Sequence, residues 1–148
     1  MNWETFPHEA DVGVRGRGDS LAEAFAGAAT ALTSVICDPA KVGAGETARI
    51  ECAAPDDELM LVDWLNALVF EMATRRMLFS RFDVIVEAAA DGVFLRARAW
   101  GEAVDVAPRA ARAGHDVDRE ADRVLAVPGV AAAGVAVGDE DVVLALEV

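Results

Sequence analysis

Apolar residues recur at helical spacing in two segments of the chain. The first segment predicts a helix over residues 20–36, which Ser20 and Glu23 open as a capping box and which a nearby proline ends. The second predicts a helix over residues 55–75, which opens on proline and three acidic residues and closes on arginines, as the helix dipole favours. Trp64 lies on the apolar stripe of this second helix, so we expect it to pack in the core.

Elsewhere the apolar residues alternate with polar ones, or cluster as β-branched and aromatic runs between turn signals, which is typical of strands. We expect strands at residues 12–17, 47–53, 82–87, 93–100, 130–137 and 142–148, and a short helix at residues 116–125. The third and fourth strands should form one hairpin and the last two another. This pattern predicts an α+β fold in which a mainly antiparallel β-sheet packs the two helices against one face.

The size and composition of the chain narrow its class. Its 148 residues are 54% hydrophobic, which is enough for a core, so we expect a single domain over residues 1–148. No apolar run approaches the roughly 18 residues that a membrane span needs, so we expect a cytoplasmic protein with no membrane association. Cys37 and Cys52 match no zinc pattern, and we expect both to be small apolar residues without a disulfide.

Acidic residues outnumber basic ones by 26 to 13, which gives a formal net charge of −13. Binding of a phosphate backbone depends on clustered lysine and arginine, so we expect no direct nucleic-acid binding. The acidity suits docking onto a basic protein surface, and it equally suits a soluble, self-repelling surface.

A polar group precedes the strand that we expect to begin at Val12. His8, Glu9 and Asp11 stand where polar side chains usually face a site, and the carboxylate of Asp11 could bind a hard cation. Glycines at positions 13, 16 and 18 follow, and they allow other backbone to approach this strand closely.

Five blocks of the sequence, taken in order, resemble the archease family. They are Trp3 and Glu4 with the signature His8–Gly13, the capped helix after Ser20, Asp38 with Lys41 and Val42, the block Asp63–Asn66, and Gly101 with Glu102. The close resemblance covers residues 3–106, and the tail, residues 107–148, diverges. The resemblance implies an accessory protein, not itself an enzyme, that promotes guanylylation and repeated turnover of an RtcB-type RNA ligase in tRNA splicing and RNA repair.

The resemblance also implies a divalent-cation site, with Ca²⁺ as the expected ion. Its ligands would be Asp11 and the acidic residue one place before the C-terminus, here Glu147, where the family usually has aspartate. Pairing of the first and last strands could bring these carboxylates together, and Val148 could add a main-chain oxygen. The alternative is that both acids are solvated residues at strand ends.

His8, Asp38 and Lys41 match other blocks of the family, so they are expected to face the ligase or to support the cation ligands. His8 could equally be structural, and Asp38 and Lys41 could form a loop ion pair. One block is missing: archeases typically carry a lysine and a threonine before the final hairpin, where this chain has the segment Leu125–Gly129.

Two further function classes fit parts of this pattern. A small metal-dependent hydrolase could use Asp11, Glu147 and His8, although these residues provide no nucleophile paired with a base. A chaperone-like interaction module without any chemistry is the other alternative. The two classes are separated by whether a metal binds and whether a ligase responds.

Overall fold

The computed structural model describes residues 2–8, 11–103, 132–138 and 141–146. In chain order, its elements are β1 (Asn2–His8), β2 (Asp11–Arg17), α1 (Leu21–Ile36), the 3₁₀ helix η1 (Pro39–Lys41), β3 (Glu46–Ala54), α2 (Asp57–Arg75), β4 (Met77–Ala89), β5 (Gly92–Ala103), β6 (Ala132–Val137) and β7 (Asp141–Leu146).

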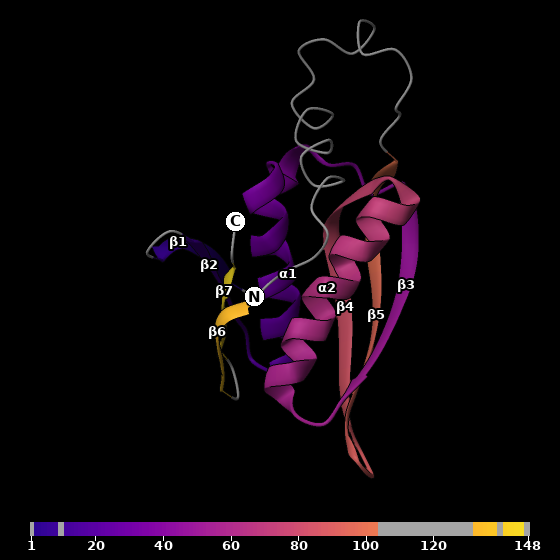
Figure 1. Ribbon diagram of the computed structural model, residues 1–148. Helices are drawn as coiled ribbons and strands as arrows, with labels where there is room; N and C mark the ends of the chain where they lie inside the picture. The colour runs from indigo at the N-terminus through magenta and orange to yellow at the C-terminus, as the bar shows by residue number, and fades with distance from the viewer. Residues whose placement is uncertain (1, 9–10, 104–131, 139–140, 147–148) are drawn as a thin grey trace, which may run out of the picture.

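The strands form two antiparallel sheets. One sheet has the order β1-β2-β7-β6 and the other the order β3-β5-β4. Both helices contact strands of both sheets, and Figure 1 shows the two sheets on opposite sides of the helices. The predicted α+β class is confirmed, with its two helices and antiparallel strands. The strands divide into two sheets instead of one because sheet membership depends on long-range pairing, which local patterning does not encode.

Both predicted helices are present, and their first residues show what opens them. Ser20 caps α1, since its Oγ accepts a hydrogen bond from the Glu23 N–H at 3.2 Å. The second helix starts two residues later than predicted, because Asp56, in extended conformation, is its N-cap and accepts from the Leu59 N–H at 2.8 Å. Proline therefore precedes the cap of α2 instead of opening its first turn.

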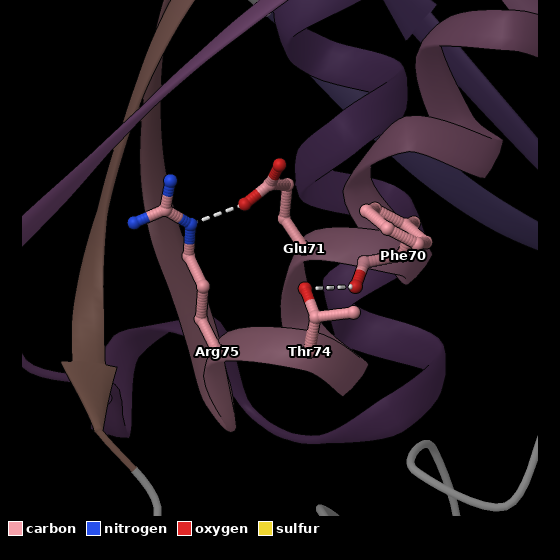
Figure 2. A network of polar contacts seen from close by, with 4 residues as sticks. All are labelled: Phe70, Glu71, Thr74 and Arg75. Carbon is pink, nitrogen blue, oxygen red and sulfur yellow. Dashed lines mark hydrogen bonds and ion pairs between the residues drawn. The ribbon is translucent and has the colours of Figure 1, made fainter.

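The last turn of α2 is held by its own side chains (Figure 2). The Arg75 guanidinium pairs with the Glu71 carboxylate one turn earlier, and Thr74 Oγ1 donates to the Phe70 carbonyl at 2.8 Å. Arg76 then ends the helix in the left-handed region, with φ 53°. The positive charge at this end complements the helix dipole, as the sequence predicted.

The core is centred on Trp64, whose side chain is fully buried. Its Nε1–H donates to the Phe25 carbonyl of α1 at 3.0 Å, and its ring meets the Phe82 ring of β4 edge to face, with centroids 6.0 Å apart. One side chain thus joins α2 to α1 and to β4. The prediction that Trp64 packs in the core is confirmed.

The strands run longer than their sequence patterns. The hairpin of β4 and β5 extends beyond both predicted strands, and Gly92 opens β5 with φ 151° where a Cβ would lie 2.3 Å from the Ala54 carbonyl oxygen. The final hairpin is confirmed as antiparallel β6 and β7. β1 was not predicted, because its residues do not alternate. The helix predicted at residues 116–125 lies outside the described residues.

Strand β2 and helix α1 touch through their backbones. A Cβ at Gly16 would lie 2.0 Å from the Ala24 carbonyl oxygen and 2.3 Å from the Ala28 nitrogen, and one at Gly27 would lie 3.0 Å from the Gly16 Cα. The close approach expected at Gly16 is confirmed. None of the described helices has the length and apolar character that crossing a bilayer requires.

Candidate functional site

Asp11 is the first residue of β2, directly across the β1–β2 ladder from His8. On its other side β2 pairs with β7, and Val12 stands opposite Leu146. The strand that carries Asp11 therefore pairs with the last strand of the chain, as expected from the sequence. This pairing brings the last described residue, Leu146, beside the start of β2.

The other two predicted cation ligands, Glu147 and Val148, lie outside the described residues, so the ligand set stays a prediction. Within the described ranges, no three His, Cys, Asp or Glu side chains gather closely enough to hold a metal ion. The backbone of β2 and β7 supplies the scaffold on which such a site could be built.

Asp38 and Lys41 flank the 3₁₀ helix η1 that follows α1. Asp38 is its N-cap, with Oδ1 accepting from the Ala40 N–H at 3.0 Å, and the Lys41 N–H donates to the Asp38 carbonyl at 3.0 Å. Because α1 runs back along β2, its C-terminal end and η1 lie toward the end of the molecule where β2 begins. Asp38 thus has a structural role as a cap, and its exposed side chain faces solvent near that end.

The two cysteines do not form a reactive site. Both are free, with Cys37 buried and Cys52 half-buried, as predicted. Burial, followed by the charge of Asp63, raises the pKa of the Cys52 thiol to about 11. The thiol therefore stays protonated near neutral pH and is a poor nucleophile.

Sequence reasoning missed one polar cluster on the first sheet. Arg15 pairs with Glu4 across β1 and β2 at 2.9 Å, and its guanidinium lies 5.7 Å from the centroid of the Phe6 ring. A hollow of about 220 Å³ lies beside this pair, lined also by Trp3 and Arg17. The signal was available in the alternation of residues 14–17, but its partner strand was not predicted.

A second cluster, of arginine and aromatic side chains on the three-stranded sheet, was also not predicted from the sequence. Arginines and aromatic side chains alternate along β5 as Phe94, Arg96, Arg98 and Trp100, which places all four on one face. In the sequence this alternation predicts a strand, and only the pairing with β3 and β4 brings further arginines beside it.

Comparisons with known proteins agree on one family. The model of the Archease protein family matches residues 3–117. Protein archease of Pyrococcus abyssi is 39% identical over 103 residues, which cover 70% of this chain and 72% of that protein. Protein archease of Methanothermobacter thermautotrophicus is 37% identical over 102 residues, which cover 69% and 73%. The solution structure of protein 1598 from Methanobacterium thermoautotrophicum is similar with a TM-score of 0.68 and 27% identity, covering 98% of this chain and 96% of that one. With the signature His8–Gly13 and the two capped helices inside the matched region, this chain belongs to the archease family.

Proposed function

We propose that this chain is an accessory protein that promotes guanylylation and repeated turnover of an RtcB-type RNA ligase in tRNA splicing and RNA repair. Family membership is the observation that carries this proposal, because the matched region, residues 3–117, includes both His8–Asp11 and η1. The protein would act by contact with the ligase and would not itself be an enzyme. The described cysteines support no nucleophilic chemistry of their own.

We further propose that a divalent cation contributes to this activity. Asp11, Glu147 and the Val148 main chain would hold it, and their all-oxygen donor set fits Ca²⁺ better than a soft metal. The ladder of β2 and β7 supports this proposal, since Val12 pairs with Leu146, and in the sequence Asp11 directly precedes Val12 and Glu147 directly follows Leu146. A bound cation would supply positive charge that ties the start of β2 to the end of β7.

The decisive experiment measures guanylylation of the RtcB-type ligase from the same organism, with and without this protein. We expect the wild-type protein to accelerate the reaction and Asp11→Ala to lose most of that acceleration. Asp19→Ala is the matched control, because it removes the same charge from an exposed position beyond the opposite end of β2.

A ligase that does not respond to the wild-type protein would refute the proposed activation. In that case calcium titration separates the remaining classes. A protein that binds no cation and activates no ligase would be an interaction module, whereas cation binding with hydrolysis of a test ester or phosphodiester would indicate a hydrolase.

A further inference from the structure

The outward face of the three-stranded sheet concentrates arginine. On β3 and β5 buried residues such as Ile50 and Leu95 alternate with exposed polar ones. The helices cover one face of this sheet (Figure 1), so the exposed residues lie on the other. The register places Arg49 opposite Arg98, and Arg81 opposite Trp100. We call this surface the arginine face; it consists of Arg49, Glu51, Arg81, Asp83, Ile85, Glu87, Phe94, Arg96, Arg98 and Trp100.

Aromatic rings hold the guanidinium groups of this face. The Arg81 guanidinium lies 4.6 Å from the centroid of the Trp100 ring, and that of Arg98 lies 5.8 Å from the same centroid. Arg96 lies 5.8 Å from the centroid of Phe94. Cation–π contact at these distances restricts the guanidinium groups while leaving N–H groups free to donate. Arg81, Arg96 and Arg98 are therefore partly preorganised for a ligand.

The charges at one end of the arginine face are not balanced. Arg49 and Arg98 stand directly opposite on neighbouring strands, and like charges in this position destabilise a sheet. Asp83 of β4 stands opposite Arg98 on its other side, and none of the ion pairs among the described residues involves Arg49 or Arg98. The ion pair on this face joins Arg96 to Glu51 at 4.0 Å, and both side chains are more than half exposed, so it contributes little. An incoming anion would relieve the repulsion.

The arginine face has a hollow that could receive a side chain of a partner, in addition to arginines that could bind its negative charges. Beside Arg49 and Arg98 is a hollow of about 620 Å³, and Ile85 is the exposed apolar residue in its lining. Ile85 is 53% exposed, so its side chain is open to contact from a partner. Arginine and tryptophan, both present on this face, are among the residues that dominate protein–protein binding energy.

We propose that the arginine face docks an acidic, extended segment of the partner ligase, an inference that rests on the proposed function. Two carboxylates of that segment would accept hydrogen bonds from Arg49 and Arg98, and an apolar side chain would cover Ile85. Docking here is separate from the start of β2, so one sheet would hold the ligase while the other activates it.

A protein segment fits this face better than an RNA strand does. The face also carries Glu51, Asp83 and Glu87, and the whole chain has a net charge of −13. A phosphate backbone bears a negative charge at every nucleotide and would meet these carboxylates along its path. A peptide can instead place its acidic residues only where the arginines stand.

The test uses the ligase from the same organism and measures its dissociation constant and its maximal guanylylation rate separately. Arg49→Gln/Arg98→Gln should weaken ligase binding by about tenfold or more, as expected when charge-assisted hydrogen bonds are lost, and leave the rate at saturating protein unchanged. The ligase affinity of Arg49→Lys/Arg98→Lys should lie between that of the wild type and that of the glutamine variant, because lysine keeps the charge without the planar guanidinium group. Thermal melts of each variant verify that the sheet is folded.

Arg75→Gln/Arg76→Gln is the matched control, because it removes two exposed positive charges at the end of α2. Equal weakening by both pairs would overturn the proposal and indicate a general charge effect. Unchanged ligase affinity in Arg49→Gln/Arg98→Gln, with activation intact in the wild type, would overturn docking while leaving the proposed function standing. A ligase that neither binds the wild-type protein nor responds to it would refute both the docking proposal and the proposed function.

The last measurement tests RNA binding with a fluorescein-labelled oligouridine of about 12 nucleotides. We expect no binding of this RNA that depends on Arg49 and Arg98. If the RNA binds the wild type, loses affinity in Arg49→Gln/Arg98→Gln and falls off steeply with salt, while ligase affinity is unchanged, the arginine face belongs to RNA and the proposal fails.

Discussion

The two sheets are built from different parts of the chain. The three-stranded sheet uses strands within residues 46–103 and contains a hairpin whose strands are joined by a tight turn. The four-stranded sheet joins residues 2–17 to residues 132–146, so its central ladder pairs strands from opposite ends of the chain. One sheet is thus completed within a single segment of the chain, with β3 and β5 pairing across α2 and β4, and the other by the longest-range pairing in the described residues.

This difference bears on where each sheet can place function. A sheet completed within one segment of the chain can present a surface, as the arginine face does, without a contribution from the chain termini. A sheet closed by the last strand brings the two ends of the sequence together, which allows a site whose ligands are far apart in sequence. The proposed cation site is of this second kind, and it depends on a pairing that costs more chain entropy to form.

The largest effect should come from removing what the two sheets share. Trp64 joins α2 to α1, which packs on β2, and to Phe82 of the three-stranded sheet. Trp64→Ala should lower the free energy of unfolding by roughly 3–5 kcal/mol, the scale for deleting a buried aromatic. Denaturant unfolding measures this loss. Trp3→Ala, at a position that is 40% exposed, should change stability by less than about 1 kcal/mol; similar losses in both variants would contradict this account of Trp64.

Calcium should act first on the four-stranded sheet, where its proposed ligand Asp11 lies. A cation that binds only the folded state stabilises it by about 2.7 kcal/mol at 100 times its dissociation constant, so the melting temperature should rise on titration. Hydrogen exchange should slow more at β2 and β7 than at β5, where only amides that exchange through global unfolding gain protection.

Asp11→Ala should abolish the calcium effect and Asp19→Ala should retain it. If neither Ca²⁺ nor Mg²⁺ shifts the melt of the wild type in metal-free buffer, the cation site is absent from this chain.

What the sequence could predict follows the same division between local and long-range contacts. Both helices, the central hairpin and the final hairpin were predictable, because capping residues, apolar periodicity and turn residues act within a few positions of one another. The start of α2 was misplaced by two residues, since proline and the aspartates Asp56 and Asp57 are all acceptable near a helix start and only the hydrogen bond to Leu59 decides between them. The division into two sheets could not be read locally.

The candidate site shows the same limit. The pairing of the Asp11 strand with the last strand could be expected, because an acidic residue stood near each end of the chain and the family resemblance supplied the link. The arginine face could not be predicted from the sequence. Its residues Arg49, Arg81 and Arg98 lie on three strands and come together only through the register of the sheet. The net charge of the whole chain, −13, gives no indication of a local concentration of arginine.

The backbone contact between β2 and α1 offers a way to disturb the four-stranded sheet selectively. Gly16→Ala would place a Cβ 2.0 Å from a main-chain oxygen of α1, and backbone on both sides leaves little room to relax. We expect a loss of about 1–3 kcal/mol, the usual cost of overpacking, measured by denaturant unfolding. Gly45→Ala is the control, because a Cβ there meets nothing within 4 Å. Equal stability of the two variants would show that β2 and α1 can separate without cost.

The smallest expected effect concerns α2 and the three-stranded sheet on which it packs. Asp56→Ala removes the oxygen that accepts from the Leu59 N–H and leaves that donor without its cap, so we expect a loss of about 1 kcal/mol. Asp56→Ser retains an accepting oxygen at the N-cap and should recover most of the stability, which separates the hydrogen bond from the charge. Hydrogen exchange in the first turn of α2 should quicken in Asp56→Ala, while the amides of β2 keep their protection because that strand is held by α1 and β7. Faster exchange in β2 as well would mean that the two sheets open together, and the cap of α2 would then stabilise the whole fold instead of one side of it.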